Sequence, residues 1–513
     1  MNHPSAQSLA AHPPAEIELK LSLPGADARD VAARLAVIPC LADAPATMLR
    51  LRNLYFDTPA QDLRRARAAL RLRSVREGTA RTRWVQTLKT AGSSEGGGLS
   101  QRGEWESRVR GPHIDAAALQ TTPWAALDVQ GEWLPQLALC FETECLRTLR
   151  RVTVADGSRI EVALDVGRVH AADGRTEDLI ELELELLEGS PDALFALAAD
   201  IAAQVPVLPS PSSKAERGWR MADGITHAPR RARQPALAAR TPLPQAAQAV
   251  LGEALGQFTQ NLGGIQQSDG AELVHQARVG WRRWLSALWL FKPLRTVHPP
   301  PDVVGLRPLL DALGSARDLD AAAQETLPAW SVPFIAGDAE RARQWQAMEA
   351  AVAAERGTRR DALLAALQAP ATGQALIALE RWLYALPQAV ESLAPELAMQ
   401  PAGAWVRRRT RRLHDRLKNE RARLKSASAD ELARRQHGVR LLAKRTRYLL
   451  EALGTVLPAR RTRHRQAKAS ELQAHIGAAR DLAVLAALLE PLGVEREIVG
   501  FLRGVAAARQ LAE

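Results

Sequence analysis

The segment 16–23, with the sequence EIELKLSL, alternates strictly between polar and apolar residues. Such alternation is typical of a β-strand, in which successive side chains point to opposite faces. Glu16, Glu18 and Lys20 would therefore share one face of the strand. The segment 180–186, with the sequence IELELEL, repeats the pattern. Glu and Leu favour helices by propensity, but a helix would scatter these glutamates around its axis, so both segments are predicted to be strands that carry rows of charged side chains.

Further alternating segments predict a sheet of about eight strands in the first half of the chain. The other candidate strands are residues 49–58, 69–73, 84–89, 102–106, 147–154 and 158–166. Asp156 and Gly157 separate the last two and form a strong hairpin signal. The order of the segments is that of an antiparallel meander, and eight strands can close into a barrel. Short helices are expected at 28–37 and 191–204.

The polar faces of these strands carry charges of both signs. Along the chain they are Glu16, Glu18, Lys20, Arg71, Arg73, Lys89, Arg102, Glu104, Glu106, Arg147, Asp165, Glu181, Glu183 and Glu185. Inside a barrel, unpaired charges would be too costly for a dry core, so the lumen is expected to hold water, ions and a ligand. The mixture suits a compact polyanion that a divalent metal bridges to the carboxylates, and oxygen ligands favour Mg²⁺ or Mn²⁺. For any single residue, the alternative is a solvated charge on a surface strand.

The second half of the chain is predicted to be all-α, because Ala, Leu and Arg recur there at helical spacing. Four prolines between 229 and 244 indicate a linker. The chain of 513 residues is therefore expected to be a multidomain α+β protein. Its predicted parts are a disordered tail at 1–15, a strand-rich domain at 16–222, a linker at 223–245 and a helical domain at 246–513.

The helical half contains an internal repeat. Residues 275–283 parallel 437–445, and residues 313–318 parallel 476–481, with offsets of 162 and 163. In each copy, basic residues follow a histidine after three and seven positions, which places them within about 60° of one helix face. The two resulting stripes are His275, Arg278 and Arg282 with neighbouring Arg283, and His437, Arg440, Lys444 and Arg447. Because the arginine fork binds phosphate oxygens, the pair predicts a groove for an extended phosphate chain, with a solvated basic face as the alternative.

The charge distribution favours a polyanionic partner for the helical half. The formal net charge is +11, of which residues 1–229 contribute −4 (26 basic, 30 acidic) and residues 230–513 contribute +15 (42 basic, 27 acidic). Residues 405–468 alone hold 21 basic and 5 acidic residues. A local excess of one sign is typical of polyanion binding. Aromatic residues make up only 4% and provide little for base stacking, so nucleic acid is not the expected partner, although RNA or DNA binding by the basic region remains an alternative.

Cysteine usage and hydropathy bear on location. The three cysteines form neither a metal-binding spacing nor an even set of disulfides, which is typical of a reducing compartment. The N-terminal residues lack the pattern of a signal peptide, and no apolar run reaches the roughly 18 residues of a membrane span. We expect a cytoplasmic protein without membrane contact, and polyphosphate granules are one place where it could reside.

Several motifs resemble known families. In this order, EIELK at 16–20, LYFDTP at 54–59, LRLR at 70–73, LKTAG at 88–92, RGEWE at 102–106, ELELE at 181–185 and SK at 213–214 resemble the CYTH domain, also called the triphosphate tunnel metalloenzymes. The helical half resembles the CHAD domain, and the pair resembles bacterial CYTH–CHAD inorganic triphosphatases. The first repeat departs from the CHAD pattern, since Trp281, Trp284, Leu285 and Trp289 stand where further basic residues are common.

The CYTH resemblance implies an eight-stranded tunnel that hydrolyses or rearranges triphosphates with a divalent metal, and the CHAD resemblance implies binding of inorganic polyphosphate. Basic residues must neutralise a triphosphate before a nucleophile approaches. We expect catalytic roles for Glu18, Lys20 and Lys89, with Glu18 positioning or deprotonating the attacking water. The expected metal ligands are Glu16, Glu18, Glu181 and Glu183. The expected substrate-binding residues are Arg71, Arg73, Lys89, Arg102, Glu104, Glu106, Arg147, Asp165, Glu185 and Lys214.

The predicted function is therefore hydrolysis of the phosphoric anhydride bond of inorganic triphosphate, with Mg²⁺ or Mn²⁺ as cofactor and with inorganic polyphosphate as partner of the helical half. Two alternatives stay open. One is a polyphosphate-binding protein without catalysis. The other is a hydrolase or cyclase that acts on an organic triphosphate, such as thiamine triphosphate or ATP.

Overall fold

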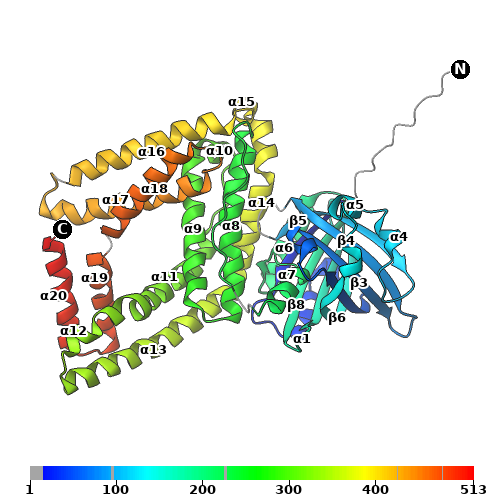
Figure 1. The fold of residues 1–513 in the computed structure, drawn as a ribbon, viewed down its shortest axis with the longest axis horizontal. Helices are drawn as coiled ribbons and strands as arrows, with labels where there is room; N and C mark the ends of the chain where they lie inside the picture. The colour runs from blue at the N-terminus through cyan, green and yellow to red at the C-terminus, as the bar shows by residue number, and fades with distance from the viewer. Residues whose placement is uncertain (1–14, 94–97, 225–227, 425, 476–477, 513) are drawn as a thin grey trace. The chain divides into compact units, whose positions relative to one another are not determined.

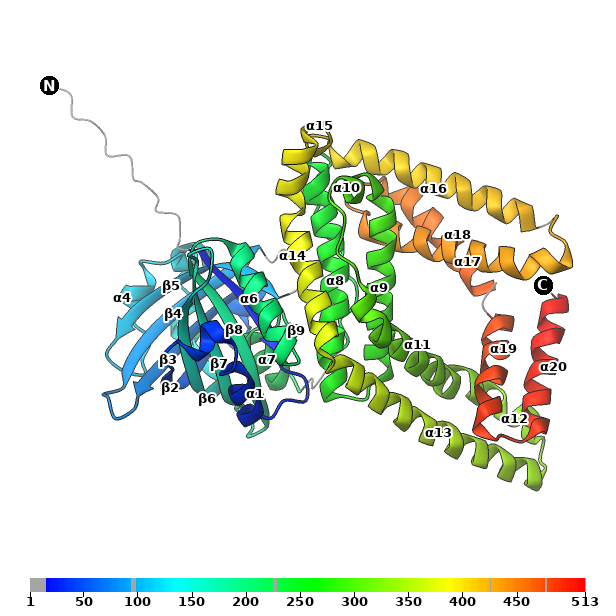
Figure 2. The same cartoon turned by 180° about the vertical axis from the view of Figure 1, so that it is seen from behind.

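The computed structural model describes residues 15–93, 98–224, 228–424, 426–475 and 478–512 (Figures 1 and 2). The chain divides into two compact units, Met1–Ala228 and Pro229–Glu513. The predicted disordered tail lies outside the described residues except for Ala15, which begins the first strand. Each unit has its own secondary structure and core.

The first unit is built on a closed antiparallel sheet. Its strands are β1 (Ala15–Ser22), β2 (Thr47–Asp57), β3 (Ala68–Glu77), β4 (Arg83–Ser93), β5 (Leu99–Val109), β6 (Ala138–Thr153), β7 (Arg159–Ala171), β8 (Thr176–Glu188) and β9 (Leu208–Pro209). The order is β5-β4-β3-β2-β6-β7-β8-β1-β9, and pairing of β5 with β1 closes the sheet. The predicted eight-stranded tunnel is confirmed by β1 to β8. The short β9 was not predicted, because two residues carry no alternation.

Alternation in β1 separates two buried environments rather than core from solvent. Leu19 and Leu21 are fully buried on one face, and β1 contacts helix α6 (Pro191–Gln204). Glu18 and Lys20 are also buried, at 4% and 7% exposure, on the lumen face. The polar side chains are therefore enclosed in the tunnel, which the sequence predicted only on the condition that the sheet closes.

Helices pack against the sheet, as α6 and α7 do in Figure 2. Besides α6, they are α1 (Ala28–Leu35), α2 (Pro39–Ala42), α3 (Asp62–Arg65), α4 (Ala116–Leu119), α5 (Trp124–Leu127), η1 (Leu134–Gln136) and α7 (Lys214–Ala222). Helix α7 begins at a capping box in which Ser213 and Glu216 exchange hydrogen bonds with each other's backbone N–H. It packs on β6 and β7, and its Gly218 fits against the ring of Phe141, where an added Cβ would lie 2.0 Å from a ring carbon. This close fit fixes the end of α7 that carries Lys214.

The second unit is all-α, as predicted. Its helices are α8 (Leu243–Gln267), α9 (Ala271–Leu290), α10 (Lys292–Val297), η2 (Val304–Leu306), α11 (Arg307–Ala321), η3 (Ala322–Thr326), η4 (Leu327–Ala329), α12 (Ser331–Ile335), α13 (Ala339–Leu367), α14 (Pro370–Leu393), α15 (Pro395–Ala398), α16 (Ala402–Leu424), α17 (Ala429–Ala452), α18 (Ala459–His475), α19 (Ala478–Leu489), η5 (Glu490–Leu492) and α20 (Arg496–Ala512). Taken singly, none of the described helices is long and apolar enough to cross a bilayer; α13 and α14, bent by 58°, reach that length only when counted together.

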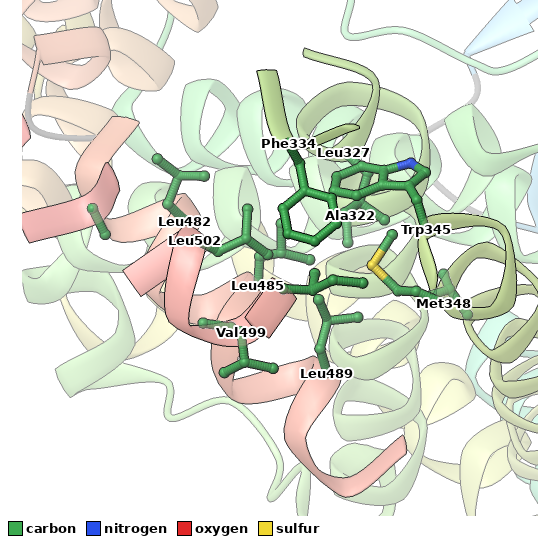
Figure 3. Close-up of a cluster of buried hydrophobic side chains, with 14 of the residues drawn as sticks. Ala322, Leu327, Phe334, Trp345, Met348, Leu482, Leu485, Leu489, Val499 and Leu502 are labelled. Atoms are coloured by element: carbon green, nitrogen blue, oxygen red, sulfur yellow. The ribbon is translucent and has the colours of Figure 1, made fainter. Parts of the chain in front are cut away.

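The duplicated segments occupy equivalent helices. The two histidines lie on α9 and α17, which contact each other. Residues 313–318 lie in α11, and residues 478–481 of the second copy begin α19, while 476 and 477 lie outside the described residues. Helix α9 packs on α8, and α17 packs between α16 and α18. Near the C-terminus, α19 and α20 bury Leu485 and Leu502 against Phe334, Trp345 and their neighbours (Figure 3). Contacts that join α19 and α20 to residues more than a hundred positions earlier make the helical unit one folded body.

The segment expected as a linker is partly integrated into the helical unit. The backbone N–H of Arg230 donates to Asn261, and its guanidinium donates to Glu253 at 2.8 Å. Further along, the Gln234 amide donates to the carbonyl of Glu451 on α17. The boundary between the two units therefore lies at 228/229, and residues 229–242 form an ordered strap on α8 and α17. Residues 225–227 of the expected linker lie outside the described residues.

Candidate functional site

One side of the tunnel lumen holds a dense network of buried ion pairs. Strand register places Lys20 opposite Glu183, Arg147 opposite Asp165, and Asp165 opposite Glu181. Three cations, Lys20, Arg147 and Lys214, meet carboxylates here. The contacts are Lys20 with Glu18 at 2.9 Å and Glu183 at 2.5 Å, Arg147 with Asp165 at 2.7 Å and Glu183 at 2.6 Å, and Lys214 with Asp165 at 2.7 Å, Glu183 at 3.1 Å and Glu181.

Asp165, Glu181 and Glu183 form a carboxylate trio that fits a hard divalent cation. One oxygen from each of these side chains lies within 4.8 Å of the other two. Carboxylate oxygens are the ligands that Mg²⁺ and Mn²⁺ prefer. Two of the four predicted metal ligands, Glu181 and Glu183, thus belong to the trio, together with Asp165, for which the sequence predicted a substrate contact. A bound metal would polarise a phosphoryl oxygen and lower the pKa of a water molecule.

The electrostatics of the trio depend on its cations. Burial alone would raise the pKa of Asp165, but the charges of Lys214 and Arg147 hold it at about 2. The pKa of Glu183 is likewise lowered, because Lys20, Lys214 and Arg147 outweigh the effect of burial. Both carboxyls are therefore ionised at neutral pH, which is the protonation state that a metal requires.

A second network lies where β1 meets β5. Lys89 contacts Glu16 at 2.9 Å and Glu104 at 2.7 Å. Arg71 contacts Glu104 at 3.1 Å and Glu106 at 3.7 Å. Burial and a hydrogen bond with Glu104 raise the pKa of Glu16. Glu16 thus belongs to a group with Lys89 and Glu104, because its ion pair with Lys89 and its hydrogen bond with Glu104 involve these residues and not the carboxylate trio.

Arg73 is a lumen cation without a carboxylate partner among the described residues. Its Nε donates at 2.7 Å to the amide oxygen of Asn53, and the amide nitrogen of Asn53 donates to the hydroxyl of Thr143. Burial and the positive charges of Arg71 and Arg147 lower the pKa of the Arg73 guanidinium. Three guanidinium groups thus act on one another in the lumen, and an anion bound there would relieve their repulsion.

Glu185 presents the opposite situation. It lies opposite Glu18 in the sheet register. Burial raises the pKa of Glu185 to about 7, and the neighbouring Glu16 and Glu161 act in the same direction. A carboxyl that titrates near neutral pH inside a tunnel is a group that bound cations or protons would neutralise.

Sequence reasoning missed several neutral residues that orient the charged ones. Ser100 donates to Glu18 at 3.0 Å, Thr87 donates to Glu106 at 3.1 Å, and Asn53 accepts from Arg73. Each occupies a lumen-facing position of its strand. The signal in the sequence was the alternation itself, which places these residues on the same face as the neighbouring charged residues. The side chain of Arg102, predicted to bind substrate, lies outside the described residues, although its backbone pairs with Glu16.

In the helical unit, residues of helix α11 hold the first stripe. The Nδ1 atom of His275 accepts a hydrogen bond from Arg317 at 3.1 Å. Burial and the charge of Arg317 lower the pKa of His275, so this histidine is neutral at pH 7. Arg278 donates to the carbonyl of Leu313 at 3.1 Å and lies 3.7 Å from Asp318. Arg282 is exposed.

Arg283 of the first repeat and Arg447 of the second share one carboxylate partner, Glu451. Arg283 is buried and contacts Glu451 at 2.9 Å, and Arg447 contacts the other oxygen of Glu451 at 3.4 Å. The structure therefore uses Arg283 as a link between α9 and α17, in contact with a carboxylate. In the second stripe, His437 is exposed, and Arg440 and Lys444 are half-buried.

Trp289 of the first repeat contacts cations of α16 and α17. Arg409 on α16 lies 5.8 Å from the ring centre of Trp289 and 5.4 Å from that of Trp405, and Arg445 on α17 lies 4.9 Å from Trp289. Such cation–π contacts hold guanidinium groups in place. Trp289, which interrupts the basic pattern in the sequence, therefore contributes to the basic region at 405–468.

A closed antiparallel sheet with paired charges in its lumen, joined to a duplicated basic helical unit, defines the class of this protein. Residues 14–219 match the CYTH domain, and residues 249–490 match the CHAD domain. The chain therefore carries a CYTH domain followed by a CHAD domain, as the motifs predicted.

Solved structures resemble each part. The CHAD domain of the plant Ricinus communis is 29% identical, covers 56% of this chain and 93% of its own length, and gives a TM-score of 0.47. A putative adenylyl cyclase from Hippeastrum, described as having a dominant triphosphatase activity, is 22% identical over 40% of this chain and 96% of its own, with a TM-score of 0.29. A Pyrococcus horikoshii protein is 16% identical over 40% and 99%, with a TM-score of 0.27.

The CYTH domain indicates an enzyme of the triphosphate hydrolase or cyclase type that depends on a metal. The trio of Asp165, Glu181 and Glu183 is suited to bind such a metal.

Proposed function

We propose that this protein hydrolyses inorganic triphosphate in the tunnel of its first unit with Mg²⁺ or Mn²⁺. The observation that carries the proposal is the arrangement of the lumen. Arg147 contacts Asp165 and Glu183 of the carboxylate trio, and its charge also acts on Arg73, a cation with no carboxylate partner among the described residues. Metal-ready carboxylates beside guanidinium groups suit a ligand that is itself highly charged and compact.

Residue roles follow from the contacts. The trio would hold the metal, while Arg71, Arg73 and Lys89 would bind phosphoryl oxygens. Glu18, held by Lys20 and Ser100, would orient or deprotonate the attacking water. The proton would pass from that water to the Glu18 carboxylate, and the bond between phosphorus and the bridging oxygen would break, releasing phosphate and diphosphate.

The test is phosphate release from inorganic triphosphate, thiamine triphosphate and ATP, each with Mg²⁺ or Mn²⁺. Inorganic triphosphate should be the best substrate, EDTA should abolish release, and Glu18→Gln should reduce kcat by roughly 10²- to 10⁴-fold, the range for loss of a general base. Formation of a cyclic nucleotide with diphosphate from ATP would instead identify a cyclase, and full activity in EDTA would refute the metal-dependent mechanism.

We further propose that the helical unit binds inorganic polyphosphate. The basic excess at 405–468 and the Arg409 and Arg445 side chains stacked on aromatic rings support this partner. Electrophoretic retardation of polyphosphate by the full chain tests it, with duplex DNA at equal phosphate concentration as competitor. Effective competition by DNA would identify nucleic acid as the preferred polyanion.

A further inference from the structure

The ammonium group of Lys214 lies among the oxygens that would bind the metal. It contacts Asp165 Oδ2 at 2.7 Å, Glu183 Oε1 at 3.1 Å and Glu181 Oε1. The Lys214 side chain is only 4% exposed. Each member of the trio thus already has a cation on one oxygen, and that cation belongs to the protein.

The remaining oxygens of the trio are also engaged. Asp165 Oδ1 accepts from Arg147 at 2.7 Å, Glu183 Oε2 lies 2.6 Å from Arg147, and Glu181 Oε2 lies 3.7 Å from Arg217. A divalent cation of the Mg²⁺ type binds oxygen at about 2.1 Å, well inside the space that Lys214 occupies. Direct binding to all three carboxylates therefore requires the ammonium group to leave.

The side chain of Lys214 can move away from the trio while helix α7 stays folded. It is the first residue of α7, and the Ser213–Glu216 capping box and the contact of Gly218 with Phe141 hold the backbone. Lysine carries its charge on a flexible four-carbon stem. A buried ammonium group needs a replacement partner when it moves, and a phosphoryl oxygen of a triphosphate in the same lumen provides a negative charge.

We propose that Lys214 gates the metal site: its ammonium group occupies the carboxylate trio until a triphosphate draws it away, so that anion and metal bind with positive coupling. The anion part of this inference rests on the proposed function. By linkage, the factor by which the anion tightens metal binding equals the factor by which the metal tightens anion binding. An enzyme of this kind keeps its metal site closed until substrate is present.

The test measures Mn²⁺ binding by the full chain from the electron paramagnetic resonance signal of free Mn²⁺, without turnover. Lys214→Met and Lys214→Gln are compared with wild type, with and without a non-hydrolysable imido analogue of triphosphate. Without the analogue, both variants should bind Mn²⁺ about tenfold more tightly than wild type, within the usual range of coupling energies. The analogue should tighten binding about tenfold in wild type and less than about twofold in the variants.

Lys89→Met is the matched control, because Lys89 contacts Glu16 and Glu104 outside the trio. In the absence of the analogue, it should keep the Mn²⁺ affinity of wild type. Unchanged or weaker Mn²⁺ binding in folded Lys214→Gln protein would overturn the gate. Tighter binding in the variants, combined with no effect of the analogue on wild type, would overturn the role of the triphosphate. Neither result depends on phosphate release, so failure of the proposed activity would be seen separately.

Discussion

Arg73 and Arg147 are lumen arginines with different partners. Arg147 forms a bidentate pair with Asp165 and also contacts Glu183, whereas Arg73 bonds to the neutral Asn53. The same chemical group is therefore a structural counter-ion in one position and a charge available to an anion in the other.

We expect Arg73→Gln to raise the KM for triphosphate by roughly 10- to 100-fold, the value of a charge-assisted hydrogen bond, with a small change in stability. Arg147→Gln should lower the free energy of unfolding by up to about 3–5 kcal/mol, because it removes a buried cation from Asp165 and Glu183 and leaves them only their lysine partners. Steady-state kinetics and urea unfolding of both variants provide the check. Equal loss of stability in the two variants would contradict this division of roles.

Glu185 makes stability depend on pH. Burial and neighbouring carboxylates raise its pKa from 4.5 to about 7 in the folded protein. The folded state therefore keeps a proton that the unfolded chain releases, and the stability from this group, fully present below about pH 4.5, is lost as pH rises to about 7.

Glu185→Gln, which cannot ionise, should therefore be more stable than wild type at pH 8 by about 1–2 kcal/mol, a value reduced for the partial exposure of this side chain. The difference should nearly vanish at pH 5. Calorimetric unfolding in EDTA at both pH values measures it, and a difference of equal size at pH 5 and pH 8 would exclude Glu185 as the titrating group.

At the scale of single helices, α9 and α17 carry equivalent motifs with unequal surroundings. Arg278 on α9 is held by Asp318 and a backbone carbonyl, and His275 is neutral. Helix α17 packs against α16 and α18. Burial and the charge of Arg416 on α16 lower the pKa of Arg445 on α17, so basic residues of the two helices lie close together.

We therefore expect Arg440→Ala with Lys444→Ala to weaken polyphosphate binding more than Arg278→Ala with Arg282→Ala. Loss of two phosphate contacts should reduce the slope of log affinity against log salt by about 1–2, because each contact releases close to one counterion. Titrations at several salt concentrations measure both effects. The asymmetry would be wrong if the first-repeat pair reduced the slope as much.

At the scale of the molecule, the two units have separate cores. The first unit closes its own sheet through the β1–β5 pairing, and residues of the segment 229–242 bond to α8 and α17 of the helical unit. A polypeptide of residues 1–228 should therefore fold and retain triphosphatase activity within about twofold of the full chain, and phosphate release combined with circular dichroism measures this. A folded but inactive fragment would show that the helical unit contributes to catalysis.

Local sequence was sufficient for the strands and for the lining of the tunnel. The period of two is a property of extended backbone wherever it lies, so Glu16, Glu18, Lys20, Arg71 and Arg73 could be assigned to one face without knowledge of the fold. Helix α6 was predicted with its observed bounds, 191–204, because a proline at the first turn and apolar spacing mark it.

Pairing between distant segments could not be read in this way. Asp165 joins Glu181 and Glu183 because β7 and β8 pair in one register, and Lys214 reaches them from helix α7, which packs on β6 and β7. Arg283 faces Glu451 across two helices, although its sequence neighbours predicted a phosphate ligand. The charge that a side chain meets depends on contacts across tens to hundreds of residues, and local periodicity carries no record of them. The sequence therefore determined which charged residues of the strands share the lumen face, and the tertiary structure determined which of them neutralise one another and which are left for a ligand.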